Sequence, residues 1–241
     1  MEYEKIRRAF SRLKETPLHP QWFAFRKEQD ALKMICSQMR GLVLDIGCAD
    51  QKVRPFLSED ATYIGLDYYH TAVFWYKTRP QIYGDAQCLP FSDSSLHWIL
   101  MMNVLEHLPN ADRCLEEVYR VLTNGGKLVI HVPFMYPLHD KPLDFQRWTI
   151  YGLRVLAQSH GFRIIQETPK GRPLETAALL TNIALSKTVL HWISQKNPLS
   201  IMVLLLPPII LCANVLAWLL SKIVPPDSIM PHGFSVILMK D

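Results

Sequence analysis

The sequence predicts an α/β fold in which helices cover both faces of a mostly parallel sheet. From residue 41 onward, short apolar runs of strand length alternate with segments of helical periodicity. Each run is bounded by Gly, Pro, Asn or Asp, which are typical of turns. Strands that alternate with helices in this way form parallel sheets covered on both faces.

The first 40 residues predict a helical lead-in to this domain. A second helical pattern runs from Trp22 to Met39, and Pro17 and Pro20 separate it from a first one. The hydrophobic pattern changes at residue 41 from helical periodicity to short apolar runs, so we expect the main domain to begin there. The first pattern consists of Met1, Ile6, Phe10 and Leu13.

Five apolar runs predict strands, and two amphipathic segments between them predict helices. A helix over Ala111–Leu122 is expected to end in a C-terminal cap at 124–126, which reads NGG. A second helix over Thr149–His160 is expected to end at Gly161. The predicted strands are LVLDI (42–46), YIGLD (63–67), LHWILMM (96–102), KLVIHV (127–132) and FRIIQE (162–167).

Composition and charge exclude several classes of function. The chain has 241 residues, 49% of them hydrophobic, so it can bury a full core and is expected to form one domain with an appendage. A formal net charge of +4 is too mild to indicate nucleic-acid binding. Basic residues outnumber acidic ones only toward the two ends, in 1–40 and 171–241. Such flanks suit an anionic membrane surface or a phosphorylated substrate, and ordinary solvation equally.

The cysteines and the first residues predict a cytoplasmic protein. The five cysteines are odd in number and include no CxxC pair, which favours a reducing compartment and argues against a zinc site. The segment MEYEKIRRAFSRLKE carries charges throughout and does not resemble a secretory signal. We therefore expect no metal centre.

Acidic side chains follow three of the predicted strands. They are Asp45 after LVL, Asp67 after YIGL and Asp85 in YGDAQCLPF. Ligands of open parallel sheets bind at the carboxyl ends of the strands. The turn after Asp45 has a single glycine, Gly47, instead of the G-x-G-x-x-G that cradles a dinucleotide phosphate. Carboxylates there favour a ligand with a positive centre and a ribose diol, and they exclude a dinucleotide oxidoreductase.

The same segments carry a resemblance to a known family. The blocks VLDIGCADQ, YIGLDYY, GDAQCLPFSDSSLHWILMMNVLEHLPN and EEVYRVLTNGGKLVIHVP occur in order over about residues 41–168. They resemble class I S-adenosylmethionine-dependent methyltransferases, within the type 11-like group of small-molecule and glycan enzymes. The resemblance implies a Rossmann-like sheet of seven strands, closed by an antiparallel strand at Phe234–Lys240, and S-adenosyl-L-methionine as the cofactor.

For the methionine end of the cofactor, the resemblance implies a role for five residues. Asp45 and Gly47 would shape the site, and Cys48 and Ala49 would bring the backbone close to the ligand. Asn103 would lie near the ammonium group. Ala49 departs from the family, which usually has a second glycine there, and the extra methyl group puts the cofactor affinity in question.

For the adenosine end, the resemblance implies that Asp67 holds the ribose hydroxyls and that Tyr68 lies beside the adenine. Asp85 would accept a hydrogen bond from the adenine amino group, and the Ala86 amide would face the ring. The structural alternatives are that Asp45 and Asp67 only cap their strands, and that Asp85 only serves a turn.

The segment VPFMYPLHDKPLDFQRWT at 132–149 predicts the acceptor side of the site. Its pattern resembles a subgroup of methyltransferases that act in polysaccharide or lipid-linked glycan biosynthesis. Methyl transfer to a hydroxyl requires alignment and the removal of one proton. His139 is the predicted base, because imidazole titrates near neutral pH, and Asp144 or Asp140 is expected to orient it.

Three further residues are candidates for binding the acceptor. Arg147 is suited to a carboxylate or phosphate, and Trp148 to stacking on a sugar or ring. His107, in NVLEHLPN, is a candidate acceptor contact, although packing is the more common role of such a histidine. The competing interpretation of the loop is an ion pair between Asp144 and Arg147, with His139 capping a turn.

Residues 171–232 predict an apolar helical insertion. Asn197–Ser221 contains no charge, but Pro207 and Pro208 divide it into pieces too short to span a bilayer. Both ends of the insertion join one sheet, so any crossings must be even in number. Ala177–Trp192 is expected to form a flanking amphipathic helix. A bent, re-entrant or surface-lying helical pair therefore fits best, with membrane contact through 197–224. The alternatives are an apolar interface, a cover over the sheet and a true membrane span.

The expected organisation is a helical lead-in (1–40), a cofactor-binding core (41–170), the insertion (171–232) and a closing strand (233–241). We expect a methyltransferase, peripheral or monotopic at the inner face of a membrane, that methylates oxygen on a lipid-linked glycan or an amphiphilic small molecule. The alternatives are an isoprenoid quinone or phenol acceptor, and a catalytically silent protein that binds a membrane or a partner. A homo-oligomer is compatible with the sequence.

Overall fold

A computed structural model describes residues 13–225 and 227–241. The chain divides into two compact units. One unit consists of the residues up to Gln29, Met135–Pro137 and Lys170–His232, and the other of Asp30–Phe134, Leu138–Pro169 and Gly233–Asp241. Of the first predicted helical pattern, Met1, Ile6 and Phe10 lie outside the described residues, and Leu13 lies in a turn.

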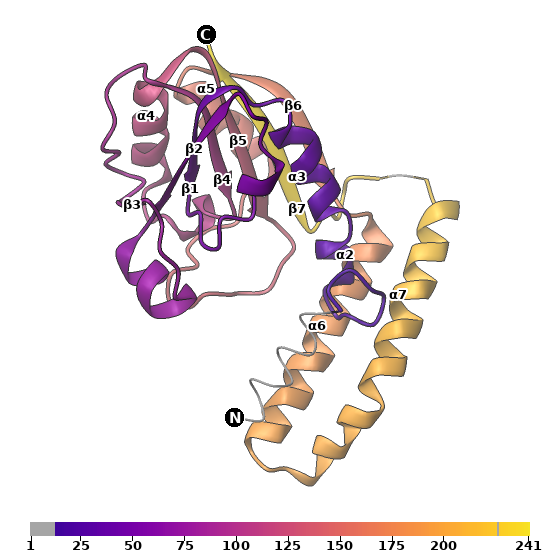
Figure 1. Cartoon of the computed structure of the whole chain (residues 1–241). Coiled ribbons are helices and arrows are strands. Elements are labelled where there is room, and N and C mark those ends of the chain that lie inside the picture. The colour runs from indigo at the N-terminus through magenta and orange to yellow at the C-terminus, as the bar shows by residue number, and fades with distance from the viewer. Residues whose placement is uncertain (1–12, 226) are drawn as a thin grey trace. The chain divides into compact units, whose positions relative to one another are not determined.

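A seven-stranded sheet forms the centre of the second unit, in the order β3-β2-β1-β4-β5-β7-β6 (Figure 1). The pairs β1–β2, β1–β4, β2–β3 and β4–β5 are parallel, and β7 is antiparallel to β5. The predicted mostly parallel sheet with an antiparallel closing strand is thus confirmed. The strands are β1 (Gly41–Ile46), β2 (Ala61–Asp67), β3 (Ile82–Tyr83), β4 (Leu96–Met102), β5 (Leu122–Pro133), β6 (Phe162–Lys170) and β7 (Gly233–Lys240).

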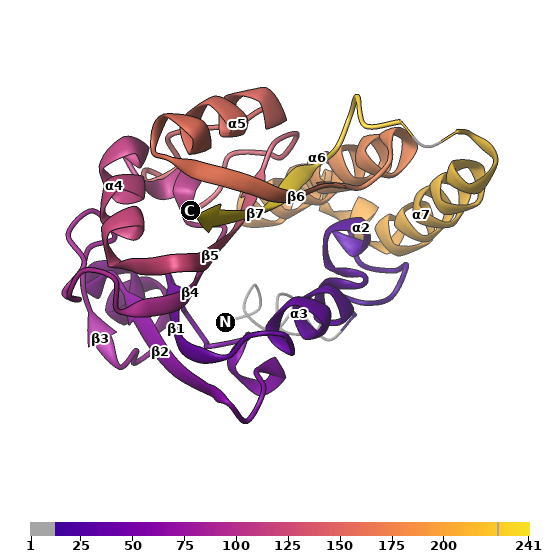
Figure 2. The same cartoon turned by 90° about the horizontal axis from the view of Figure 1, so that it is seen from above.

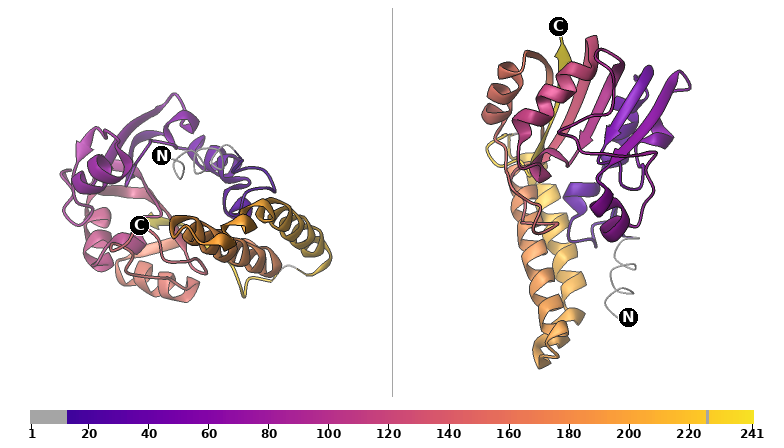
Figure 3. Two further views of the ribbon diagram at one scale, coloured as in Figure 1. Left: turned by 90° about the horizontal axis from the view of Figure 1, so that it is seen from below. Right: turned by 90° about the vertical axis from the view of Figure 1, so that its left-hand side faces the viewer.

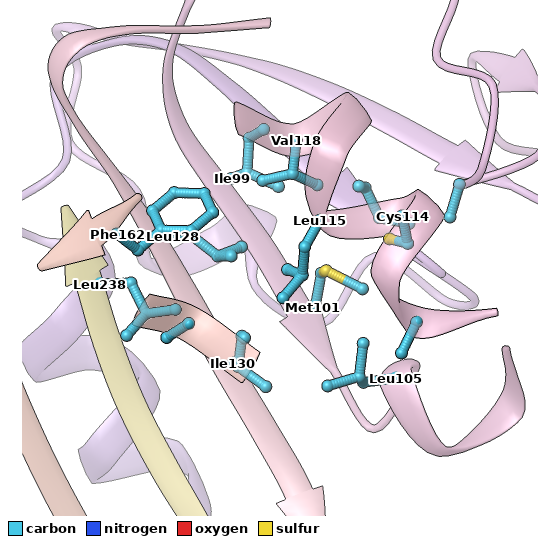
Figure 4. Packing of buried hydrophobic residues seen from close by; sticks show 14 of the residues in the cluster. Ile99, Met101, Leu105, Cys114, Leu115, Val118, Leu128, Ile130, Phe162 and Leu238 are labelled. Carbon is cyan, nitrogen blue, oxygen red and sulfur yellow. The ribbon is translucent and has the colours of Figure 1, made fainter. Parts of the chain in front are cut away.

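Helices cover both faces of the sheet, as predicted (Figure 2). Successive strand residues point to opposite faces, so Leu44 of β1 packs with α4 (Ala111–Val121) and α5 (Ile150–Ser159), whereas Val43 packs with α3 (Glu28–Cys36). Figure 4 shows the larger of the two cores, where Leu115 and Val118 of α4 lie over Ile99 of β4.

Two predicted helix boundaries are wrong. α4 begins at an Asn110 cap, whose side chain accepts from the Arg113 amide, but it ends at Val121 and Leu122 directly begins β5. The NGG segment therefore lies inside β5 and caps nothing. The predicted helix Trp22–Met39 is two helices, α2 (Trp22–Phe25) and α3, which are separated at Lys27 by a left-handed backbone (φ 67°).

The remaining short helices lie between strands. They are the 3-10 turns η1 (Arg54–Phe56) and η3 (Leu105–His107) and the π-helix η2 (Thr71–Tyr76). η2 follows β2 and η3 follows β4, so both lie near the carboxyl ends of strands. Helix α5 begins at a Thr149 cap and is followed by Gly161 at φ 79°, as predicted.

In the first unit, two long helices lie side by side, α6 (Pro173–Ser194) and α7 (Leu206–Ile223) (Figures 1 and 3). The 3-10 segment η4 (Pro198–Leu204) connects them. The uncharged stretch 197–221 is interrupted just before Pro207 and Pro208. The two pieces are unequal, because the first is a short 3-10 segment and the second is the long helix α7. Both prolines lie in the first turn of α7, where a missing N–H removes no helical hydrogen bond. The 18 residues of α7 are long and apolar enough to cross a membrane, judged by length and composition alone.

Candidate cofactor and acceptor site

The turn after β1 positions Asp45 and holds the chain against β2. Tyr63 of β2 donates a hydrogen bond to Asp45 Oδ2 at 2.8 Å, and the Asp45 side chain is buried. The amides of Gly47 and Cys48 both donate to the Leu66 carbonyl. Gly47 has φ 69°, and a Cβ there would lie 2.5 Å from a methyl carbon of Val104. Glycine is therefore required by both the backbone conformation and the space.

Asp67, at the end of β2, is buried and connects the two neighbouring turns. Its carboxylate accepts from the amides of Ala49 and Tyr68, each at 2.8 Å, and from the Thr71 hydroxyl at 3.2 Å. An ionised carboxylate offers about four acceptor positions. Three bonds thus fix its orientation and leave capacity for a ligand hydroxyl.

Ala49 adopts φ 40°, in the left-handed region. This conformation costs an L-residue about 1–2 kcal/mol relative to its ordinary ones, whereas glycine adopts it freely. The departure from the family's glycine is therefore accommodated with local strain. The amide of Ala49 nonetheless reaches Asp67, so the turn keeps its connection to β2.

Asp85 lies two residues after β3, at the same edge of the sheet. The Gly84 amide donates to the Asp67 carbonyl, and Asp85 Oδ1 accepts from the Gln87 amide at 2.8 Å. The structure thus shows the turn role of Asp85 that competes with a ligand role. Ala86 is buried beside it. A role of this pair at the adenine remains a prediction.

Two other predicted cofactor residues lie on the surface. Tyr68 is exposed directly after Asp67, and Asn103 is exposed after β4 with φ 57°. The amide of Asn103 donates to the His131 carbonyl at 2.8 Å, which sets the end of β4 against β5. Both side chains are accessible to a ligand.

The pKa of Asp45 is raised from 3.8 to about 7. Burial, which disfavours the charged carboxylate, is the main cause, and the negative charges of Asp67 and Asp50 add to it, while the hydrogen bond from Tyr63 opposes it. Within 13–225 and 227–241, no lysine or arginine forms an ion pair with Asp45 or Asp67. The edge is thus an uncompensated negative site.

We expect Asp45→Asn to stabilise the cofactor-free protein at about pH 8, with a gain that shrinks toward pH 4. Folded wild type keeps the Asp45 proton up to about pH 7, whereas the unfolded chain loses it near pH 4, so wild-type stability falls between these values. At about 1.4 kcal/mol per pKa unit, the gain amounts to a few kcal/mol. Urea unfolding at several pH values measures it.

Glu59→Gln is the matched control, because Glu59 is an exposed carboxylate that does not contribute to the pKa shift of Asp45. Its stability should follow that of wild type across the pH range. If Asp45→Asn and wild type lose stability in parallel, the carboxylate of Asp45 is not the buried charge described here.

The acceptor loop, residues 138–149, is attached to the segments that follow β2 and β4. The Tyr76 hydroxyl of η2 donates to Asp140 Oδ2 at 2.7 Å. The Phe145 amide donates to the Glu106 carbonyl, and the Gln146 side chain donates to the Leu108 carbonyl, both at 2.9 Å. The loop is therefore held at the carboxyl edge of the sheet, where the sequence predicted the acceptor side.

His139 lies between two carboxylates. Its Nδ1 is 3.3 Å from Asp144 Oδ2, and its Nε2 is 3.8 Å from Glu106 Oε1. These acids raise the pKa of His139, Glu106 most strongly, while burial lowers it. Of the two carboxylates predicted to orient this ring, Asp144 contacts it, whereas Asp140 accepts from Tyr76.

The ion pair that competes with a substrate role for Arg147 is present. Both guanidinium nitrogens of Arg147 donate to the Asp144 carboxylate, one of them at 2.7 Å, and this lowers the pKa of Asp144 to about 2. The His139 amide also donates to Asp144. Trp148 is partly buried and packs against the main core, and stacking on an acceptor stays a prediction.

No sequence pattern indicated a role for Glu106, Tyr63 or Tyr76. Glu106 follows Leu105 in NVLEHLPN, but its proximity to His139 depends on how the loop folds back. Two surface hollows lie at the opposite edge, one beside Gly161 and one beside Gly125, and neither contains a predicted site residue. The candidate site is therefore defined by its side chains.

The strand order and the acids at its carboxyl edge define a class I S-adenosylmethionine-dependent methyltransferase fold. Residues 44–130 match the family model described as a methyltransferase domain. Residues 44–130 are thus similar to the methyltransferase domain of S-adenosylmethionine-dependent enzymes, as the sequence predicted, and such enzymes use S-adenosylmethionine as the cofactor.

Individual relatives agree with this assignment. The ubiquinone/menaquinone biosynthesis C-methyltransferase UbiE of Legionella pneumophila is 32% identical over 95 residues, which are 39% of this chain and 33% of that protein. The chain thus matches about a third of that relative's length.

Solved structures show the same fold. The [4+2]-cyclase SpnF has a TM-score of 0.58 at 16% identity, over 91% of this chain and 82% of that one. An S-adenosylmethionine-dependent methyltransferase from Archaeoglobus fulgidus has a TM-score of 0.56 at 16% identity, over 91% of this chain and 99% of that one.

The residues at the carboxyl edge fit this cofactor chemically. Buried Asp45 and Asp67 carry no compensating cation among the described residues; both accept hydrogen bonds, and Asp45 is ionised above its raised pKa of about 7. These carboxylates suit a ligand that brings positive charge and hydroxyl groups that donate hydrogen bonds, and they repel phosphate. A cationic nucleoside matches both requirements.

Proposed function

We propose that this protein transfers a methyl group from S-adenosylmethionine to an oxygen of a lipid-linked glycan or an amphiphilic small molecule at a membrane surface. The single observation that supports cofactor use most strongly is the uncompensated Asp45 and Asp67 pair at the carboxyl ends of β1 and β2. S-adenosylmethionine would supply an activated methyl group there. The match over 44–130 supports the reaction class.

Each side chain of the candidate site has a role in this proposal. Asp67 binds the ribose hydroxyls, and Asp45 compensates positive charge at the methionine end. Asn103, at the end of β4, binds the ammonium group of the cofactor. On the acceptor side, His139 takes the proton of the hydroxyl at Nε2, since its Nδ1 faces Asp144. Asp144 acts as a positioning residue through this contact.

The end of the α6–α7 pair supports the membrane context. The surface that we call the hairpin end, residues 198–211, exposes large apolar side chains, with Leu204 exposed to 71%. Only 28% of α7 is buried, whereas the core helix of a soluble protein would be mostly buried. Large exposed apolar patches mark membrane or partner contacts. Other exposed members are Leu199, Ile201, Met202, Leu205 and Ile209.

A surface-lying arrangement fits the charges beside this patch. Exposed Lys187, in the second half of α6, and exposed Lys196, directly before the connection between the helices, suit anionic headgroups. An interfacial helix buries its apolar side by about 5–10 Å. Further up the pair, Asn182 donates to Asn214 in a fully buried contact at 2.9 Å, which favours keeping this part of the pair out of the hydrocarbon core. We therefore propose a peripheral protein at the cytoplasmic face.

A quinone or phenol acceptor is the second candidate. The likeness to a quinone C-methyltransferase over 95 residues favours it, and the apolar hairpin end would then guide the isoprenoid tail. A non-catalytic role is the third. The fold does not by itself impose methyl transfer, because one structure that shares it is named a [4+2]-cyclase.

The test uses the full chain, S-adenosylmethionine with an isotopically labelled methyl group, and membrane lipid extracts. We expect labelled lipid-linked glycan or amphiphile, detected by mass spectrometry as a gain of one methyl group, and no label with heat-inactivated protein. Label confined to quinones would establish the second candidate instead. Cofactor binding without any labelled product would overturn the enzymatic proposal.

A further inference from the structure

Glu106 is a buried acid without a hydrogen-bond partner for its side chain. It lies in η3 directly after β4, and its side chain is completely inaccessible to solvent. Among the described residues, neither carboxylate oxygen accepts a hydrogen bond. Burying a carboxylate in this state is costly unless a positive group compensates it.

Two imidazoles face this carboxylate. Nε2 of His107 and Nε2 of His139 each lie 3.8 Å from the same oxygen, Oε1 of Glu106. The two rings are 5.0 Å apart in an edge-to-face arrangement, and the three ligand atoms lie within 4.8 Å of one another. Two nitrogens and one oxygen therefore converge on one point.

The opposite nitrogen of each ring is held by an oxygen. Nδ1 of His107 is 2.6 Å from the Leu143 carbonyl, and Nδ1 of His139 is 3.3 Å from Asp144 Oδ2. Arg147 in turn fixes Asp144. Metal-binding histidines almost always donate their second N–H to a carboxylate or carbonyl, which directs the other nitrogen to the ion. Both rings have this arrangement.

We propose that Glu106, His107 and His139 bind a divalent transition-metal ion. With bonds of about 2.0–2.1 Å, ligand atoms around tetrahedral zinc lie about 3.4 Å apart, so separations of 3.8 Å to Glu106 and of no more than 4.8 Å among all three atoms close with side-chain shifts of about 1 Å or less. Two imidazoles and one carboxylate favour Zn²⁺, Fe²⁺, Co²⁺ or Mn²⁺ over Mg²⁺ and Ca²⁺.

The sequence predicted no metal centre, because that expectation rested on cysteine spacing. Glu106 and His107 are adjacent and His139 follows 32 positions later, so no short motif indicates the site. The attachment of the acceptor loop to η3, through the Phe145 amide, brings the third ligand to the other two.

The role of this metal rests on the proposed function. Three protein ligands leave a position open for an acceptor oxygen, and a bound metal lowers the pKa of a hydroxyl that coordinates it. Nε2 of His139 would then bind the metal ion instead of taking the acceptor proton. The ion, and not the imidazole, would activate the acceptor hydroxyl. Metal binding itself requires neither cofactor nor acceptor.

The experiment titrates Co²⁺ and Zn²⁺ into the full chain, purified without a histidine tag and freed of metal by a chelator. We expect one equivalent to bind, with visible d–d bands of Co²⁺ in a low-symmetry site. Glu106→Gln and His139→Asn should each weaken binding by about 100-fold or more, since loss of an outer partner alone costs 10–100-fold. Asp144→Asn should weaken it less.

His160→Ala is the matched control, because His160 also lies beside a carboxylate, 3.7 Å from Asp112, but without a third ligand. It should bind metal like wild type. If Glu106→Gln fails to fold, His107→Asn and His139→Asn decide the question.

Equal metal affinity in wild type and these variants, or no Co²⁺ bands in wild type, would overturn the proposal. Protonated His139 would then compensate Glu106 without a metal. Calorimetry of S-adenosylmethionine binding on the same metal-free samples tests the proposed function separately.

Discussion

Replacing Asp67 by Ala is expected to abolish S-adenosylmethionine binding, with a loss of affinity of at least 100-fold. Hydrogen bonds to a charged acceptor contribute about 1.5–3 kcal/mol each, and a ribose diol makes two of them. The substitution also leaves the amides of Ala49 and Tyr68 without their present acceptor, which loosens the turn that would face the ligand. Isothermal titration calorimetry measures the change.

Two control variants separate ligand binding from turn structure. Thr71→Val removes one hydrogen bond to Asp67 and leaves its carboxylate in place for the ligand, so affinity should fall far less than in Asp67→Ala. Asp50→Ala removes an exposed acid nearby and should bind normally. Unchanged affinity in Asp67→Ala would refute the ribose assignment.

Replacing Leu204, Leu205 and Ile209 together by Ser is expected to release the protein from liposomes. These side chains are 71%, 52% and 44% exposed, so the change removes little folded-state packing. Burying an aliphatic side chain in an apolar phase contributes about 1.5–3 kcal/mol. Losing three should lower membrane partitioning by roughly 100-fold or more. Flotation of the full chain with vesicles containing anionic lipid measures this.

A matched variant carries Ser at Val155 and Ile165, which are exposed apolar residues of α5 and β6. It should float with vesicles like wild type. Continued flotation of the triple variant would remove the membrane contact from the hairpin end. Failure of wild type to float would instead favour an apolar protein interface.

The sheet was predictable because its central strands are continuous apolar runs with turn residues at both ends. Leu44 and Val43 face different cores, so both faces must be apolar and the pattern is unambiguous. Helix ends were less predictable. The NGG segment has the composition of a cap, yet it lies inside β5, between the paired residues Leu122 and Lys127, because the strand begins at Leu122 without a loop. Local composition could not show where the strand begins.

The cofactor side was predicted from strand ends, where the topology alone brings Asp45 and Asp67 together. The acceptor side was predictable only in part. His139 and Asp144 lie in one loop and do contact each other, but Glu106 joins them through a fold-back of that loop. Trp148 packs in part against the core, and its stacking on an acceptor stays a prediction. Contacts between segments that are distant in the sequence are not visible in its hydrophobic periodicity.

The most direct test of the central claim is an experimental structure of the full chain with S-adenosylmethionine bound. The account predicts that the ribose hydroxyls lie within hydrogen-bond distance of the Asp67 carboxylate, with the methionine end beside Gly47 and Asp45. A cofactor bound elsewhere, or no binding at saturating concentration, would contradict it.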